Sequence, residues 1–208
     1  AAIEAGLEAE GAALLGGDAE LDFTYRSASP DEQAWMAERA ERVSAIVEFR
    51  SMAVVGAGDT SERALTQVKA VDDLYPLIGE MVLDPALPLE QALEIGPEGR
   101  PGAVMERALS DRLGLAPGDV FALGETEFRL TDSAASGFSL GPRTLVRRAA
   151  LDGSGLLAPG TLFNSKYRLD LPEGTALDPL EAEAEARFAD AGMRWTDARN
   201  GAPGVSRF

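Results

Sequence analysis

The chain has 208 residues, 45% of them hydrophobic, with a formal net charge of −16 and a sequence pI of about 4.4. This length suits one large domain or two small ones, and the acidic surface repels phosphate backbones, which argues against a nucleic-acid partner. Because histidine and cysteine are absent, a Ser-His-Asp triad, a thiolate nucleophile, disulfides and zinc–thiolate sites are excluded.

Targeting and membrane signals are also absent from the sequence. No apolar run approaches the length of a membrane span, no signal peptide is visible, and the chain does not begin with methionine. A lack of cysteine fits an extracytoplasmic domain that avoids stray disulfides. We therefore expect a piece of a longer protein.

The first predicted elements are a helix and a strand. Residues 1–15 have the spacing of a helix with one apolar stripe, which Gly16-Gly17 ends; the stripe contains Ile3, Leu7, Leu14 and, as a candidate member, Gly11. Residues 21–26 alternate between apolar and polar, as in a strand with one buried face; the apolar members are Leu21, Phe23 and Tyr25.

A second helix and a long second strand follow. Ser29 suits the N-cap of a helix, Pro30 its first turn, and the acidic pair at 31–32 the positive end of its dipole. Residues 43–55 alternate like a strand, and the turn at 56–59 leads into the next one.

The stretch from Ala64 to Gly79 is interpreted as the joint of the chain. Its first part alternates like a strand with one solvent-exposed face. Thr66, Val68 and Ala70 share one face, and Gln67 and Lys69 share the other. Asp72-Asp73 ends the alternation, and Tyr75-Pro76 requires an extended or turning backbone. We interpret this stretch as the exit from a first subdomain into an inserted one. The alternative is an ordinary strand end and turn.

The elements predicted between Gly79 and Pro159 are short, as in a small, mainly β insertion. They are a helical turn at 89–93, a strand at 102–105, a helix at 106–115, and a hairpin of 120–123 and 127–130. From residue 161 the earlier pattern returns, with a strand at 166–171, a helix at 179–191 and a strand at 193–199. This strand-helix-strand order repeats that of 19–55 and predicts two similar units in one sheet.

No catalytic motif is convincing. Asp72 and Asp73 are adjacent, so on a strand they point to opposite faces, and turn formation explains them better than a carboxylate pair. Residues 137–141 have the Gly-x-Ser-x-Gly spacing of a nucleophile elbow, but Pro142 follows directly and no histidine partner exists. A Gly-x-x-x-x-Gly-Lys-Ser/Thr phosphate loop is also absent. We predict that the chain is not an enzyme and binds no cofactor.

Two stretches are distinctive, KAVDDLYPLIG at 69–79 and SGFSLGPRTLV at 136–146. They resemble the YbbP-like large permeases of ABC transporters, within the wider group that has FtsX-type membrane segments and MacB-like periplasmic domains. Further matches extend over nearly the whole chain: ALLGGDAEL at 13–21, SPDEQAW at 29–35, FRSMA at 49–53, YRLDLPEG at 167–174 and RNGAPGVSRF at 199–208.

The resemblance implies an α+β fold, that of a MacB-like first periplasmic domain. A porter-like α/β subdomain would be formed by both chain ends, at 18–77 and 159–208, around an inserted, mainly β, Sabre-like subdomain at 78–158. Residues 1–17 would continue the first membrane helix, and residues 205–208 would lead into the second. The chain departs from the family at 131–135, where an acidic, proline-containing loop is usual. Either the loop is shorter here or residues are absent from the sequence.

For function, the resemblance implies transport without chemistry in this piece, on the periplasmic side of the bacterial inner membrane. A separate cytoplasmic subunit would bind ATP, and this domain would couple the movement of membrane helices to export or extraction of hydrophobic, lipid-like substrates. Its partners would be that subunit and the rest of the permease, including a second periplasmic domain. The alternative is a docking scaffold for a soluble periplasmic lysophospholipase or thioesterase.

The candidate site residues lie in the two distinctive stretches and form a predicted substrate path or subdomain seam. They are Lys69, Asp72, Asp73, Tyr75, Phe138, Leu140 and Arg143. The alternative, that the apolar and aromatic members are simply core, stays open.

Overall fold

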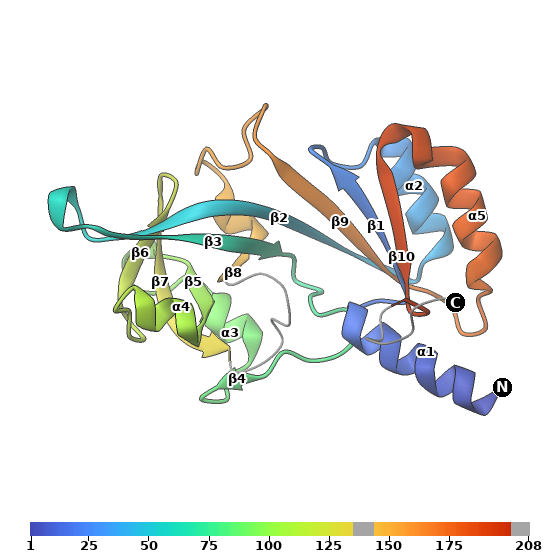
Figure 1. Ribbon diagram of the computed structural model, residues 1–208, viewed down its shortest axis with the longest axis horizontal. Coiled ribbons are helices and arrows are strands. Elements are labelled where there is room, and N and C mark those ends of the chain that lie inside the picture. The colour runs from blue at the N-terminus through green and yellow to red at the C-terminus, as the bar shows by residue number, and fades with distance from the viewer. Residues whose placement is uncertain (135–143, 201–208) are drawn as a thin grey trace. The chain divides into compact units, whose positions relative to one another are not determined.

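The computed structural model describes residues 1–134 and 144–200, and the chain divides into two compact units (Figure 1). The first unit contains Ala1–Ile46, Leu74–Glu80 and the chain from Asn164 onward, and the second contains Val47–Asp73 and Met81–Phe163. These units differ from the predicted boundaries mainly at Val47–Asp73, which the prediction assigned to the porter-like part. The reason is strand pairing, because this segment forms a hairpin whose strands also pair with later strands of the second unit. The Sabre-like and porter-like identities of the parts stay predictions.

The first unit is built on a sheet with the strand order β10-β1-β9-β2. Its strands are β1 (Ala19–Thr24), β9 (Phe163–Asp170), β10 (Met193–Asp197) and the first residues of β2 (Arg42–Val55). Helix α2 (Pro30–Arg39) connects β1 to β2, and α5 (Leu177–Phe188) with the short 3-10 turn η4 (Ala189–Ala191) connects β9 to β10. Two strand-helix-strand segments therefore interleave in one sheet, as predicted from the sequence, in a split βαβ arrangement.

The helices α2 and α5 lie beside the strands of this sheet (Figure 1). Their apolar side chains share one core with those of the strands. Trp35 of α2 meets Phe188 of α5 edge to face, with ring centroids 5.4 Å apart. Leu21 and Phe23 of β1 are fully buried, and each such side chain contributes about 1.5–3 kcal/mol. Tyr25 does not continue this pattern, because β1 ends at Thr24 and Tyr25 has a φ of 60° and is exposed.

Sequence signals for helix ends are confirmed at α2 and α1. The Ser29 hydroxyl accepts a hydrogen bond from the Glu32 backbone N–H, and the Glu32 carboxylate accepts one from Ser29 N–H, which together form a capping box. Helix α1 (Ala2–Leu15) ends at Gly16, whose φ is 82°.

The large residues of the apolar stripe predicted on α1 are exposed, with Ile3 at 80%, Leu7 at 44% and Leu14 at 54%. Gly11, the small candidate member of that stripe, is buried together with Ala12. A Cβ at Gly11 would lie 1.8 Å from the Ala198 carbonyl oxygen, so backbone proximity rather than an apolar stripe positions this helix.

The second unit contains a sheet with the order β2-β3-β8-β5-β7-β4, in which β6 also pairs with β2 and β7. Its remaining strands are β3 (Glu62–Val71), β4 (Leu83–Asp84), β5 (Gly102–Glu106), β6 (Val120–Leu123), β7 (Thr126–Ala134) and β8 (Thr144–Arg147). Its helices are α3 (Leu89–Leu93) and α4 (Arg107–Arg112), with 3-10 turns η1 (Gly58–Thr60), η2 (Pro97–Gly99) and η3 (Arg148–Leu151). The predicted hairpin around Gly124-Glu125 is confirmed as β6 and β7.

Strand β8 is the element of the second unit that positions the candidate site. It runs parallel to β3 and antiparallel to β5, and it was not predicted from the sequence. Thr144 of β8 and Thr66 of β3 share a buried hydroxyl–hydroxyl hydrogen bond of 2.7 Å. Apolar side chains of these strands join a core separate from that of the first unit.

Candidate functional site

The structure gives the predicted seam residues different surroundings. Lys69 is buried in β3, opposite Glu48 of β2 and Leu145 of β8. Asp72 and Asp73 follow β3 in the second unit. Tyr75 belongs to the first unit, where the Arg168 guanidinium carbon lies 5.8 Å from its ring centre. Phe138, Leu140 and Arg143 lie outside the described residues, as do residues 205–208. Of the predicted shortened loop at 131–135, residues 131–134 continue strand β7, and only Ala135 lies outside the described residues.

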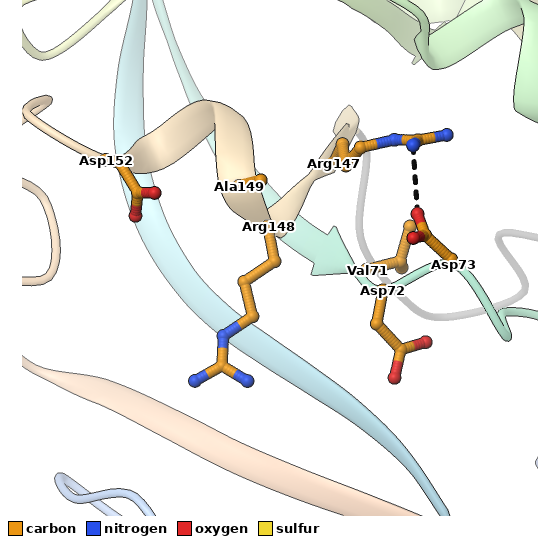
Figure 2. A pocket seen from close by; sticks show the side chains of 7 residues that line it. All are labelled: Val71, Asp72, Asp73, Arg147, Arg148, Ala149 and Asp152. Atoms are coloured by element: carbon orange, nitrogen blue, oxygen red, sulfur yellow. Dashed lines mark ion pairs between the residues drawn. The ribbon is translucent and has the colours of Figure 1, made fainter.

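Asp72 and Asp73 come together with residues of β8 because β3 and β8 are parallel. Val71 lies opposite Arg147 in this pairing, so the residues that follow both strands reach the same edge of the sheet. They form a cavity of about 380 Å³, here called the charged cavity (Figure 2). Its lining residues are Val71, Asp72, Asp73, Arg147, Arg148, Ala149 and Asp152.

The charged cavity contains one ion pair between lining residues, from Arg147 Nη1 to Asp73 Oδ1 at 2.9 Å (Figure 2). The Asp73 side chain is 81% exposed and that of Arg147 is 32% exposed. Solvent screens such a pair, and it contributes about 0–1 kcal/mol. The pair can therefore open at little cost when another anion approaches Arg147.

A second cavity of about 600 Å³ lies in the same unit and is here called the apolar cavity. Most of its lining is apolar, and the lining residues are Leu93, Glu94, Ile95, Gly99, Pro101, Thr126, Arg147, Ala149 and Ala150. Leu93 is buried, whereas Ile95 is 74% exposed. Arg147 and Ala149 line both cavities, so the charged cavity and the apolar cavity share these two residues.

Backbone contacts shape the segment that borders the apolar cavity. Gly102 N–H donates to the Glu94 carbonyl at 2.9 Å, and Gly96 N–H donates to the Arg100 carbonyl at 2.8 Å. A Cβ at Gly96 would lie 2.4 Å from Arg129 Nη2, so any larger residue here would require this guanidinium to move. The segment is thus held close to Arg129.

The sequence analysis missed Arg147, Arg148 and the apolar cavity. A signal was present, because Arg147-Arg148 is a pair of cations in a strongly acidic chain directly after the apolar run at 144–146. The partnership of Arg147 with Asp73 depends on strand pairing over long sequence separation, which a local pattern does not contain.

The described residues provide no metal site of the usual kind. Across 1–134 and 144–200, no group of three or more Asp, Glu, His or Cys side chains is placed to hold a metal ion. Within the same residues, no helix combines the length and the apolar character needed to cross a membrane.

Comparisons with solved structures identify the fold. The chain resembles the periplasmic region of MacB from Actinobacillus actinomycetemcomitans, with a TM-score of 0.54, 9% identity and coverage of 89% of this chain and 92% of that one. It also resembles the extracellular domain of the noncanonic ABC-type transporter YknZ from Gram-positive bacteria, with a TM-score of 0.52, 10% identity and coverage of 86% and 98%. The predicted α+β, MacB-like fold is confirmed, and both neighbours are periplasmic or extracellular regions, as predicted for this chain.

A comparison of sequences leads to a particular relative. No family model matches the chain. Over 177 residues it is 29% identical to the uncharacterized ABC transporter permease YbbP of Escherichia coli (strain K12). The match covers 80% of this chain and 20% of that protein, so the chain spans about a fifth of its relative's length. The predicted resemblance to YbbP-like permeases is confirmed.

Proposed function

We propose that this chain is an extracytoplasmic domain of an ABC transporter permease and that it carries out no chemistry itself. The observation that carries the proposal is the match to a permease along 80% of the chain. The likeness of its fold to periplasmic and extracellular domains of transporters supports a position on the periplasmic side of the inner membrane.

The proposed role is mechanical coupling. A cytoplasmic subunit binds and hydrolyses ATP, membrane helices of the permease move, and this domain moves with them during export or extraction of a hydrophobic, lipid-like molecule. The apolar cavity supports a hydrophobic substrate, since its volume of about 600 Å³ lies within the range of ligand pockets. The rest of the permease and its second periplasmic domain are the proposed partners. Docking of a lysophospholipase or thioesterase has no support in the contacts described above and stays a prediction.

Cysteine labelling tests the proposed location. The chain has no cysteine of its own, so Asp59→Cys at the exposed turn η1 introduces a single reactive thiol into it. In a full permease otherwise free of cysteine, a membrane-impermeant maleimide should label this thiol in intact spheroplasts. Labelling that requires permeabilised membranes would contradict the location.

Assays of the purified chain test the absence of chemistry. We expect hydrolysis of neither ATP nor lipid esters, because no phosphate loop and no histidine or cysteine nucleophile system is present in the sequence. A hydrolytic activity that co-purifies with the chain and persists after trace contaminants are removed would overturn this part of the proposal.

A further inference from the structure

We propose that the apolar cavity binds a single-chain amphiphile with an anionic head group, such as a fatty acid, and that Arg147 recognises the head group. The inference deepens the proposed function and rests on it, because it assigns a site and a chemical class to the hydrophobic substrate.

The lining of the cavity suits an alkyl chain. The apolar lining consists of Leu93 at the end of α3, Ile95 and Pro101 from the segment after α3, and Ala149 and Ala150 of η3, around a space of about 600 Å³. Ile95 leaves 74% of its surface in water, so an alkyl chain in the cavity gains by covering it.

Charge at the cavity selects an anionic head group. Arg147 lines the cavity with a side chain that is 32% exposed, and a partly buried cation attracts an anion more strongly than one in open solvent. Beneath the bordering segment, the buried Nε of Arg129 has no hydrogen-bond partner among the described residues, which adds positive potential. Glu94, the other charged lining residue, is exposed, so water screens its carboxylate more strongly.

Asp73 competes with the ligand for Arg147. The Asp73 carboxylate forms an ion pair with Arg147 at the charged cavity. An anionic head group in the apolar cavity would replace this 81%-exposed carboxylate at little cost. Arg147 thus pairs with Asp73 until an anionic head group replaces that carboxylate.

Calorimetric titration of the purified chain with dodecanoate and with dodecyltrimethylammonium, both below micelle-forming concentrations, tests the inference. The net charge of −16 attracts the cation nonspecifically, so tighter binding of dodecanoate requires a local positive site. We expect dodecanoate to bind more tightly by about fivefold or more. Tighter binding of the cation, or no binding of dodecanoate, would overturn the proposal.

Four variants separate the contributions. Arg147→Gln should weaken dodecanoate about fivefold or more without weakening the cation, and Asp73→Asn should strengthen dodecanoate up to about fivefold. Ile95→Asn should weaken both amphiphiles. Leu162→Asn is the matched control, because Leu162 is 67% exposed and does not line the cavity, and it should bind both as the wild type does.

The results have distinct meanings for the two proposals. Unchanged dodecanoate binding in Arg147→Gln or in Ile95→Asn would overturn the assigned site, and weaker binding in Asp73→Asn would overturn the competition. Circular dichroism confirms that each variant is folded. The labelling of Asp59→Cys fails or succeeds independently, so a lost binding site and a wrong location for the domain are distinguishable.

Discussion

Replacing Asp197 with alanine should destabilise the first unit by about 2–4 kcal/mol. Its side chain is fully buried and accepts hydrogen bonds from Trp195 Nε1 at 2.7 Å, from Arg199 N–H at 3.0 Å and from the Arg199 guanidinium. Removal leaves the Trp195 N–H unsatisfied, at a cost of about 1–3 kcal/mol, and adds the loss of the Arg199 backbone contact, about 1 kcal/mol. In this variant Arg199 still forms ion pairs with Asp178 and Glu181. The larger destabilisation that follows when a charged side chain loses all its partners is therefore avoided.

Tryptophan fluorescence in a urea titration measures this cost. The chain has two tryptophans, Trp35 and Trp195, and both lie in the first unit, so their emission follows that unit alone. Asp178→Ala is the control, since its side chain is 86% exposed and its removal should cost at most about 1 kcal/mol. A cost below about 0.5 kcal/mol for Asp197→Ala would refute the reasoning.

Lowering the pH should reduce the contribution of Asp197 to the free energy of unfolding. Burial by itself raises the pKa of this carboxyl, but hydrogen bonds from Arg199 and Trp195 outweigh burial and hold its pKa below the ordinary value. A lowered folded-state pKa stabilises the fold above the unfolded value of about 3.9, and this stability is lost as the pH falls through the folded pKa. The difference between wild type and Asp197→Ala should therefore be full near pH 7 and shrink below about pH 4, in fluorescence-monitored unfolding. A difference that is constant down to pH 2 would show that charge plays no part.

Four further substitutions have defined outcomes. Ser29→Ala removes the N-cap of α2 and should cost about 1 kcal/mol by tryptophan fluorescence; no change would mean that the Ser29–Glu32 contacts contribute nothing. Thr66→Val and Thr144→Val should each cost about 1–3 kcal/mol by circular dichroism, because one buried hydroxyl loses its partner, whereas the double variant should cost less than their sum. Additive costs would contradict a shared bond. Asp73→Asn should change the unfolding free energy by at most about 1 kcal/mol, and a larger cost would contradict its exposure.

Local signals made the first unit largely predictable. Ser29-Pro30 marks the start of α2 by capping chemistry, and the alternation at Leu21 and Phe23 marks β1 by burial on one face. These features depend on neighbours within a few residues. Burial of the large apolar residues of α1 was predicted wrongly, because a local sequence pattern does not show which segment a helix packs against. Here the helix approaches the Ala198 backbone through Gly11.

The candidate site was less predictable because it depends on pairing between distant strands. Asp72 and Asp73 were identified from the sequence, but their neighbour Arg147 becomes visible only when β3 and β8 align in parallel. Strand β8 is four residues long, too short for a clear alternating pattern, and so it was missed. Ile95 was missed as well, since nothing in its sequence neighbourhood indicates that it borders a cavity.

The distance between spin labels in the full permease tests the proposed coupling most directly. One label at Asp59→Cys lies at an exposed position of this domain, and its partner label lies on the second periplasmic domain of the same permease. A control pair at Glu41→Cys and Glu185→Cys lies within the first unit. With the cytoplasmic ATP-binding subunit present, addition of nucleotide should shift the distance distribution of the first pair and leave the control pair unchanged. Identical distributions for the first pair with and without nucleotide would contradict a domain that moves with the transport cycle.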